Sequence, residues 1–207
     1  MRTVGPKRHR HSSLCRHSKL RVCLRGPLRI VLCTLVGTAI ICVSYANSPS
    51  GVMLDVPFIA QPKNGCGAAS IAMVMKYWQR GGAATQPDRA DVQAIQRALY
   101  SKKAKGILAS AMERYFDAAG YRTFAISGRW SDLRENIEKG RPLIVGLAPE
   151  GPHDPLHYVV VAGIDWENNW VFVNDPAQRK LLKMDRANFE KEWAATKDWT
   201  LLAVPNS

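Results

Sequence analysis

Cysteine and histidine are scarce in the main part of this 207-residue chain. Four of its five cysteines lie within the first 42 residues, and Cys66 stands alone after them. A segment with a single cysteine cannot form an internal disulfide or a cysteine-rich zinc site. The same segment has two histidines, His153 and His157, without the cysteine pair that would complete a zinc site. We therefore expect no metal and no cofactor.

Acidic residues are missing from residues 1–29, although the chain as a whole has 17 of them. Its formal charge of +12 would suit a protein that binds nucleic acid or an acidic surface. Without the nine bases of residues 1–29, however, 20 basic residues face 17 acidic ones, a net of only +3. This balance predicts no nucleic-acid partner. The nine bases are Arg2, Lys7, Arg8, Arg10, Arg16, Lys19, Arg21, Arg25 and Arg29.

Residues 30–46 form an uncharged stretch directly after this basic region. Basic residues before an apolar run are typical of a secretory signal, and Ser44 and Ala46 are small residues before a possible cleavage point. The stretch is short for a bilayer span, which takes about 20 residues, but an uncleaved anchor is the alternative. We expect residues 1–46 to be a leader with a signal peptide or membrane anchor, 47–53 a linker, and 54–207 an exported domain, periplasmic, secreted or held at the membrane.

Helical patterns dominate the first half of this domain, and strand patterns dominate the second. After a short strand at residues 55–59, residues 67–78 are apolar on nearly every side, as in a helix at the centre of a core. Helices followed by strands predict an α+β fold with a mostly antiparallel sheet. The other expected elements are helices at 91–100 and 106–119, a strand at 121–126, a helix at 131–140 capped by Ser131, strands at 142–148, 157–165, 169–175 and 180–184, a helix capped by Asp185, and a strand at 199–204.

Cys66 lies between two glycines at the start of the apolar helix, in "GCGAAS". The first turn of a helix has unpaired N–H groups and a positive dipole end, which favour a thiolate, and a thiolate is the nucleophilic form of cysteine. The glycines would let a substrate carbonyl approach the sulfur closely. The alternative is that Cys66 is a small apolar residue of the core.

His157 and Asp175 are the residues that could act with this thiol. His157 opens a strand, where its ring would be held rigidly as a general base. Pairing Val161 with Val171 across the following turn would bring residue 157 next to residue 175, and an aspartate can orient an imidazole. Asn174 would point to the other face of the strand. The alternatives are an edge histidine with no catalytic role and a turn aspartate before a proline.

Three further residues, Asp165, His153 and Gln61, bear on this site. Asp165 lies at the far end of the strand, and His153 is expected to be an exposed loop residue between prolines. Gln61 precedes Cys66 by five residues, and its amide could donate to an oxyanion together with the Cys66 N–H. A glutamine in a surface turn is the alternative reading of Gln61.

Taken in order, Gln61, "GCGAAS", "HYVVVAGID" and "NDP" resemble the papain-like cysteine peptidases of the bacteriocin-processing, double-glycine-leader type and their stand-alone secreted relatives. The likeness covers residues 54–204 and includes "GRPLIVGL" and "FEKEW". It implies a papain-like fold in which Cys66 is the nucleophile, His157 the base, Asp175 its orienting group and Gln61 part of the oxyanion hole. Peptide or protein substrates are implied as well.

The chain also departs from this family pattern. Gly65 stands where exporter members often have an aspartate, and the spacing from Gln61 to Cys66 is slightly short for the family. No glycine-rich Lys-Ser/Thr loop follows, so coupling to export, cleavage after a double glycine and use of ATP do not carry over. The predicted reaction is peptide hydrolysis through a thioester. Acyl transfer by the same triad and a non-catalytic peptide-binding module are the alternatives.

Overall fold

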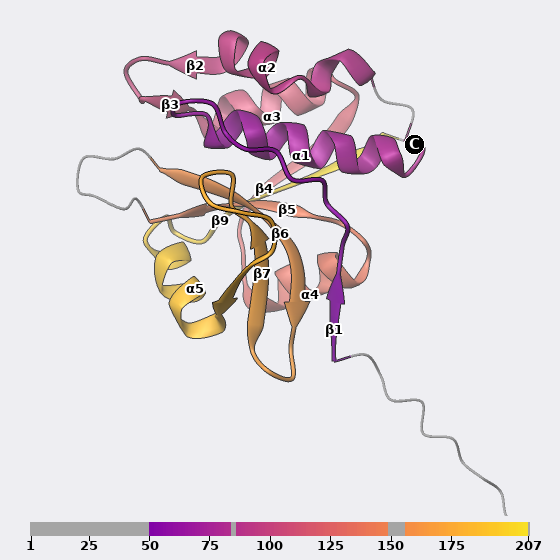
Figure 1. The fold of residues 1–207 in the computed structure, drawn as a ribbon, viewed down its shortest axis with the longest axis vertical. Helices are drawn as coiled ribbons and strands as arrows, with labels where there is room; N and C mark the ends of the chain where they lie inside the picture. The colour runs from indigo at the N-terminus through magenta and orange to yellow at the C-terminus, as the bar shows by residue number, and fades with distance from the viewer. Residues whose placement is uncertain (1–49, 84–85, 149–155, 207) are drawn as a thin grey trace, which may run out of the picture. The chain divides into compact units, whose positions relative to one another are not determined.

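An antiparallel sheet of seven strands is the centre of the fold (Figure 1). The computed structural model describes residues 50–83, 86–148 and 156–206. Strand order in the sheet is β4-β9-β5-β6-β7-β8, and β1 also pairs with β6. The strands are β1 (Gly51–Met53), β4 (Tyr121–Ser127), β5 (Leu143–Leu147), β6 (His157–Asp165), β7 (Trp170–Asn174), β8 (Leu182–Asp185) and β9 (Trp199–Pro205).

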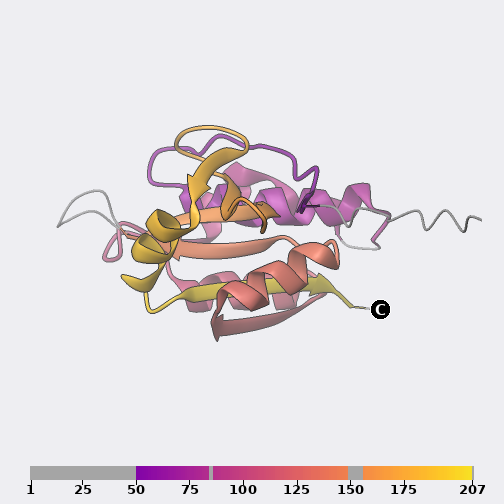
Figure 2. The ribbon, with the colours of Figure 1, turned by 90° about the horizontal axis from the view of Figure 1, so that it is seen from below.

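Helices cover both faces of this sheet. Figure 1 shows three of them together above the strands, and Figure 2 shows the other two on the side seen from below. A 3₁₀ turn, Pro87–Ala90, and a two-stranded sheet of β2 (Tyr100–Ser101) and β3 (Gly106–Ile107) complete the upper group. The helices are α1 (Cys66–Arg80), α2 (Val92–Leu99) and α3 (Ala109–Ala118) above, and α4 (Trp130–Glu138) and α5 (Arg186–Ala194) below.

Successive side chains of each strand point to opposite faces of the sheet, and this divides the core into two clusters. Tyr158 and Val160 of β6 pack in a cluster with α1 and α3, whereas Val159 and Val161 pack with α4 and α5. This is the period-two pattern of a sheet that is buried on both faces. Because α1 lies between the sheet and α2, its residues from Cys66 to Met75 are all buried. The sheet and α1 are therefore a rigid support for the side chains where the starts of α1 and β6 lie, at Cys66 and His157.

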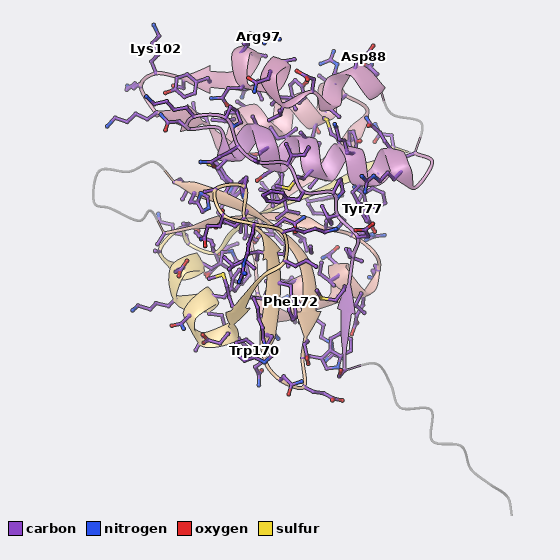
Figure 3. All side chains as sticks on the ribbon, in the orientation of Figure 1. Tyr77, Asp88, Arg97, Lys102, Trp170 and Phe172 are labelled. Atoms are coloured by element: carbon purple, nitrogen blue, oxygen red, sulfur yellow. The ribbon has the colours of Figure 1, made fainter. Side chains whose placement is uncertain are left out.

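The upper group also has a solvent side, on which Arg97 of α2 and Lys102 after β2 point away from the sheet (Figure 3). Both residues are charged and lie outside the buried core. The opposite end of the molecule carries Trp170 of β7, whose ring has the Lys183 ammonium 3.8 Å from its centroid. Arg97 and Lys102 border a pocket together with Lys63 and Asn64, which lie just before α1.

Most predicted elements are present, including the α+β class and the helix caps at Asp185 and Gly140. The Asp185 carboxylate accepts from the Asn188 N–H at 3.0 Å, and Gly140 follows α4 with a φ of +70°. The cap predicted at Ser131 is wrong, because α4 begins at Trp130 and its Asp132 carboxylate instead accepts from the Arg129 N–H at 2.9 Å.

Two strand assignments differ from prediction. The strand expected at residues 55–59 is absent from the described structure; instead, residues 51–53, placed in the linker from sequence, pair with β6 as β1. The helix predicted from residue 106 begins at Ala109, because Gly106 and Ile107 pair with β2. β1 pairs with a distant strand, and β2 and β3 are two-residue strands of a short hairpin, so local periodicity reveals neither.

The predicted leader and signal or anchor, residues 1–46, lie outside the described residues, as does His153. In the part of the chain that the structure describes, no helix is both long and apolar enough to cross a membrane.

Candidate active site

Cys66 is the first residue of α1, as its sequence context predicts. The first intrahelical bond runs from the Ala69 N–H to the Gly65 carbonyl at 2.9 Å, and no side chain caps the helix. Among the described residues Cys66 is the one cysteine; its thiol is free and the residue is 8% exposed. Its sulfur lies 3.7 Å from the Leu156 carbonyl oxygen. The thiol therefore lies at the positive end of a buried helix, beside the start of β6.

The two glycines around Cys66 are required by close packing of the protein itself. A Cβ on Gly65 would lie 2.5 Å from Pro62 Cγ, and one on Gly67 would lie 3.1 Å from Ile107 Cβ. Gly67 brings the first turn of α1 against β3. That the glycines also let a substrate carbonyl approach the sulfur stays a prediction.

His157 is the first residue of β6, and its ring bonds to the Asp175 carboxylate. Nε2 of His157 is 2.9 Å from Oδ1 of Asp175. The side chain of His157 is 21% exposed, and that of Asp175 is 4% exposed. Asp175 also accepts from the Ala177 N–H at 2.9 Å and from Gln178 Nε2 at 2.8 Å. Three donors therefore hold this carboxylate in its ionised form.

The strand register that predicted this contact is wrong, although the two residues do meet. Val161 pairs with Val173 rather than Val171, and the ladder shifts between Val161 and Gly163. Asp175 lies beyond the end of β7, in a turn closed by the Gln178 N–H to its carbonyl at 3.0 Å. Its side chain reaches the imidazole from this turn. The predicted register is wrong because the β6–β7 turn falls between Asp165 and Trp170, so the observed pairs lie two to three positions from those counted.

The electrostatics of His157 favour its charged form. Burial lowers the pKa of the imidazole, but hydrogen bonds to the Asp175 carboxylate and the Cys66 side chain, and the charges of both, raise it to about 10. Because Nε2 faces Asp175, Nδ1 is left for the Cys66 sulfur. For Asp175, burial raises the pKa, but the bonds from His157, Ala177 and Gln178 outweigh it and lower the pKa.

Gln61 lies next to this group through its backbone. Its N–H donates to the Pro176 carbonyl at 2.9 Å, which ties the segment before Cys66 to the residue after Asp175. The side-chain Oε1 of Gln61 is buried and has no hydrogen-bond partner among the described residues. Oε1 is an acceptor, so a contribution to an oxyanion hole would have to come from the amide nitrogen of Gln61.

The other candidates lie apart from this group. Asn174 donates to the Val56 carbonyl at 3.1 Å and accepts from the Leu181 N–H at 2.9 Å, so it is structural. Asp165, at the far end of β6, bonds Asn168. The described residues contain no cluster of three histidine, cysteine or acidic side chains that could hold a metal ion.

The sequence analysis did not identify Gln178, which donates to Asp175 together with His157 and Ala177. Its amide fixes the second oxygen of Asp175 at 2.8 Å. The signal was present in "NDPAQ", because an aspartate before a proline commonly forms a turn in which its side chain bonds the residues two and three positions later.

Comparison with known proteins places these residues in a family context. The model of the Peptidase C39-like family matches residues 53–200. None of the curated proteins compared matches the chain. Among solved structures, the peptidase domain of Streptococcus ComA, a bifunctional ABC transporter involved in quorum sensing, has a TM-score of 0.57 and 22% identity, covering 73% of this chain and 99% of that domain.

Two other solved structures have the same fold. A C39-like peptidase from Bacillus anthracis has a TM-score of 0.54 and 20% identity over 76% of this chain and 98% of its own. A double-glycine-motif protease from an AMS/PCAT transporter, in complex with the leader peptide, has a TM-score of 0.53 and 20% identity over 75% and 95%. The family match spans more than half of the sequence and includes Cys66, His157 and Asp175, so the chain belongs to the Peptidase C39-like family of cysteine peptidases.

Proposed function

We propose that Cys66, His157 and Asp175 are the catalytic triad of this cysteine peptidase and that Gln61 contributes to its oxyanion hole. The observation that carries the proposal is the imidazole of His157, whose Nε2 lies 2.9 Å from the Asp175 carboxylate and whose pKa is raised by the Asp175 and Cys66 side chains. A base oriented by a carboxylate and paired with a nucleophile is the arrangement that acyl chemistry requires.

The first half of the reaction forms a thioester. The Cys66 thiolate attacks the carbonyl carbon of a peptide bond, and the carbonyl electron pair moves to the oxygen. The N–H of Cys66 and the Gln61 amide donate to that oxyanion. As the tetrahedral intermediate collapses, the C–N bond breaks and the imidazolium of His157 gives its Nδ1 proton to the leaving amine.

The second half releases the acid. Neutral His157 takes a proton from water, whose oxygen attacks the thioester carbonyl, and the new oxyanion occupies the same hole. Collapse breaks the C–S bond and expels the Cys66 thiolate, which pairs again with the imidazolium formed in the attack of water. Asp175 stays ionised throughout, because Ala177 and Gln178 donate to it as well as His157.

Alkylation of Cys66 against pH tests the proposed pair. Wild-type chain and His157→Ala would be treated with iodoacetamide between about pH 5 and pH 9, and the peptide that contains Cys66 followed by mass spectrometry, since four other cysteines precede it. Near pH 6 we expect wild type to react on the order of tenfold to a hundredfold faster than the variant, because the thiolate persists only beside the imidazolium. Equal, slow reaction of both proteins would remove Cys66 from the chemistry.

Cleavage of a peptide library by the full chain then tests the activity itself. Cys66→Ala should abolish cleavage, and Asp165→Asn, at the far end of β6, is the matched variant that should retain it. Adding amine acceptors to the same reaction separates hydrolysis from acyl transfer, because transfer yields ligated peptides. Cleavage that survives Cys66→Ala would refute the proposed nucleophile.

A peptide substrate is part of this proposal, since one fold relative is known in complex with a leader peptide. We propose in addition that residues 1–46 direct the enzyme out of the cytoplasm, by a cleaved signal or an anchor. Immunoblotting of fractionated cells tests this: a full-length product in the membrane fraction excludes cleavage, and a cytoplasmic product excludes both.

A further inference from the structure

A cavity of about 420 Å³ lies directly beside His157 and Asp175. Such a volume is at the small end of ligand pockets and suits a single long side chain. Cys66 does not border it. The lining residues come from β5, β6, β8, α5 and the turn after β7, and they are Leu147, Ala148, His157, Asp175, Gln178, Leu182, Met184 and Glu192.

The walls of this cavity are apolar along part of its surface. Leu147 is buried at the end of β5, and Leu182 and Met184, two residues apart, lie on the same side of β8. Leu182 and Met184 are half-buried. Such walls favour the methylene groups of a long side chain.

Glu192 gives the same cavity an unpaired carboxylate. The neighbouring acid on α5, Glu190, bonds Arg186 at 2.9 Å, and Asp185 caps the helix. Among the described residues, Glu192 alone of these three has neither an ion pair nor a side-chain hydrogen bond. Burial raises its pKa; His157 and Lys191 oppose that effect and Asp175 adds to it.

The charges that border the cavity sum to a negative value. Asp175 and Glu192 are acids, and the imidazolium of His157 is the one cation among the lining residues. Asp175 and His157 already neutralise each other across 2.9 Å. Lys191 precedes Glu192 on α5 but does not line the cavity. The remaining charge, that of Glu192, favours a cationic occupant.

The position of the cavity indicates which part of a substrate it receives. In the proposed reaction His157 protonates the leaving amine, so the peptide that follows the scissile bond leaves over His157. The cavity borders His157 from the side of Asp175 and Gln178, not of Cys66. We assign it to the residues after the scissile bond because they are the part of the substrate that leaves past His157.

We propose that this cavity is the subsite for a basic side chain, lysine or arginine, just after the scissile bond, and that Glu192 binds its cation. The proposal rests on the proposed function, because it takes its direction from the role of His157. Leu147, Leu182 and Met184 contact the aliphatic stem, and the Glu192 carboxylate accepts from the ammonium or guanidinium group.

Paired peptides test this specificity in the full-length chain. One peptide carries lysine and its partner norleucine, which keeps the stem and lacks the cation, first at the position after the scissile bond and then at the next. We expect wild type to prefer lysine by about tenfold to a hundredfold in kcat/KM at one of the two positions, as befits a charge-assisted hydrogen bond.

Variants on α5 assign the preference to one carboxylate. Glu192→Gln should remove the lysine preference, and Glu192→Lys should turn it toward a glutamate peptide. Glu190→Gln, on the same helix and paired with Arg186, is the control that keeps it. No preference in wild type, or a preference that survives Glu192→Gln, overturns the proposal.

A binding measurement separates this inference from the proposed activity. Lysine amide and norleucine amide, which both carry an α-ammonium, would be titrated into wild type and Glu192→Gln by calorimetry. If no peptide is cleaved, the proposed function fails, and tighter binding of lysine amide that Glu192→Gln removes still supports the cationic site. Equal binding of the two amides overturns the site, whatever the activity.

Discussion

Asp175→Asn exchanges one carboxylate oxygen for an amide group in a residue that is 3% exposed. The substitution keeps the shape of the side chain and removes its charge. Because the carboxylate accepts from His157, Ala177 and Gln178, an asparagine would present its amide nitrogen to at least one of these donors. We expect the imidazolium of His157 to lose most in stability, since it is the charged partner.

The structure sets the size of this effect. The rise in the pKa of His157 from 6.5 to about 10 corresponds to roughly 5 kcal/mol in favour of the imidazolium, at about 1.36 kcal/mol per pH unit. Asp175 and Cys66 share this stabilisation. If Asp175 supplies about half, its loss is worth on the order of 2 kcal/mol, and the His157 titration midpoint falls by roughly one to two pH units.

NMR titration of the histidine rings measures that midpoint. The chain has five histidines, and the resonance of His157 is the one missing from a His157→Ala sample. Asp165→Asn, a carboxylate at the other end of β6 that bonds Asn168, is the matched control and should leave the midpoint unchanged. Urea unfolding of each variant shows that the fold is intact.

A small change in the midpoint would refute this reasoning. If folded Asp175→Asn titrates within about half a pH unit of wild type, Asp175 does not hold the imidazolium and is a turn residue before a proline. The rate of Cys66 alkylation near pH 6 should fall in parallel, because fewer thiolates are paired with an imidazolium.

Three further predictions concern the same region. Gln61→Ala should lower kcat by about a hundredfold to a thousandfold with little change in KM, because it removes one oxyanion donor; an unchanged kcat places Gln61 outside the hole. Asn174→Ala should destabilise the fold by about 2–4 kcal/mol in urea unfolding, because it leaves the Val56 carbonyl and the Leu181 N–H without their partner; a loss below about 1 kcal/mol would contradict this. The imidazolium of His157 stabilises the fold fully below pH 6.5, and this stabilisation is lost as the pH rises toward about 10. The unfolding free energy of wild type should therefore fall over that range, and that of His157→Ala should fall less. An equal fall in both proteins would contradict this.

Local sequence was enough for much of the fold, because helices and strands leave periodic patterns in a short window. The apolar run after Cys66 marked a buried helix with the thiol in its first turn, and α1 begins at that residue. The apolar stretch after His157 marked a strand with the imidazole at its start. The order of helices and strands predicted the α+β class.

Features that depend on pairing between distant segments were missed. The pairing of β1 with β6 joins distant residues that no local pattern relates. The short hairpin of β2 and β3 was missed for another reason, since its strands have two residues each and leave no periodic pattern. The β6–β7 register is fixed by its turn, which pairs Asp165 with Trp170, so sequence counting gave the wrong register for a contact that does exist.

The sequence by itself determined which chemical groups are present and the local elements that carry them: a thiol at a helix start, an imidazole at a strand start and an aspartate at a turn. Only the tertiary structure decided how these groups are held. Gln178 fixes Asp175, Ile107 packs closely against Gly67, and Glu192, 35 residues after His157, shares a cavity with it. The physical reason is that hydrogen bonds and charges act through space, whereas periodicity describes only neighbours along the chain.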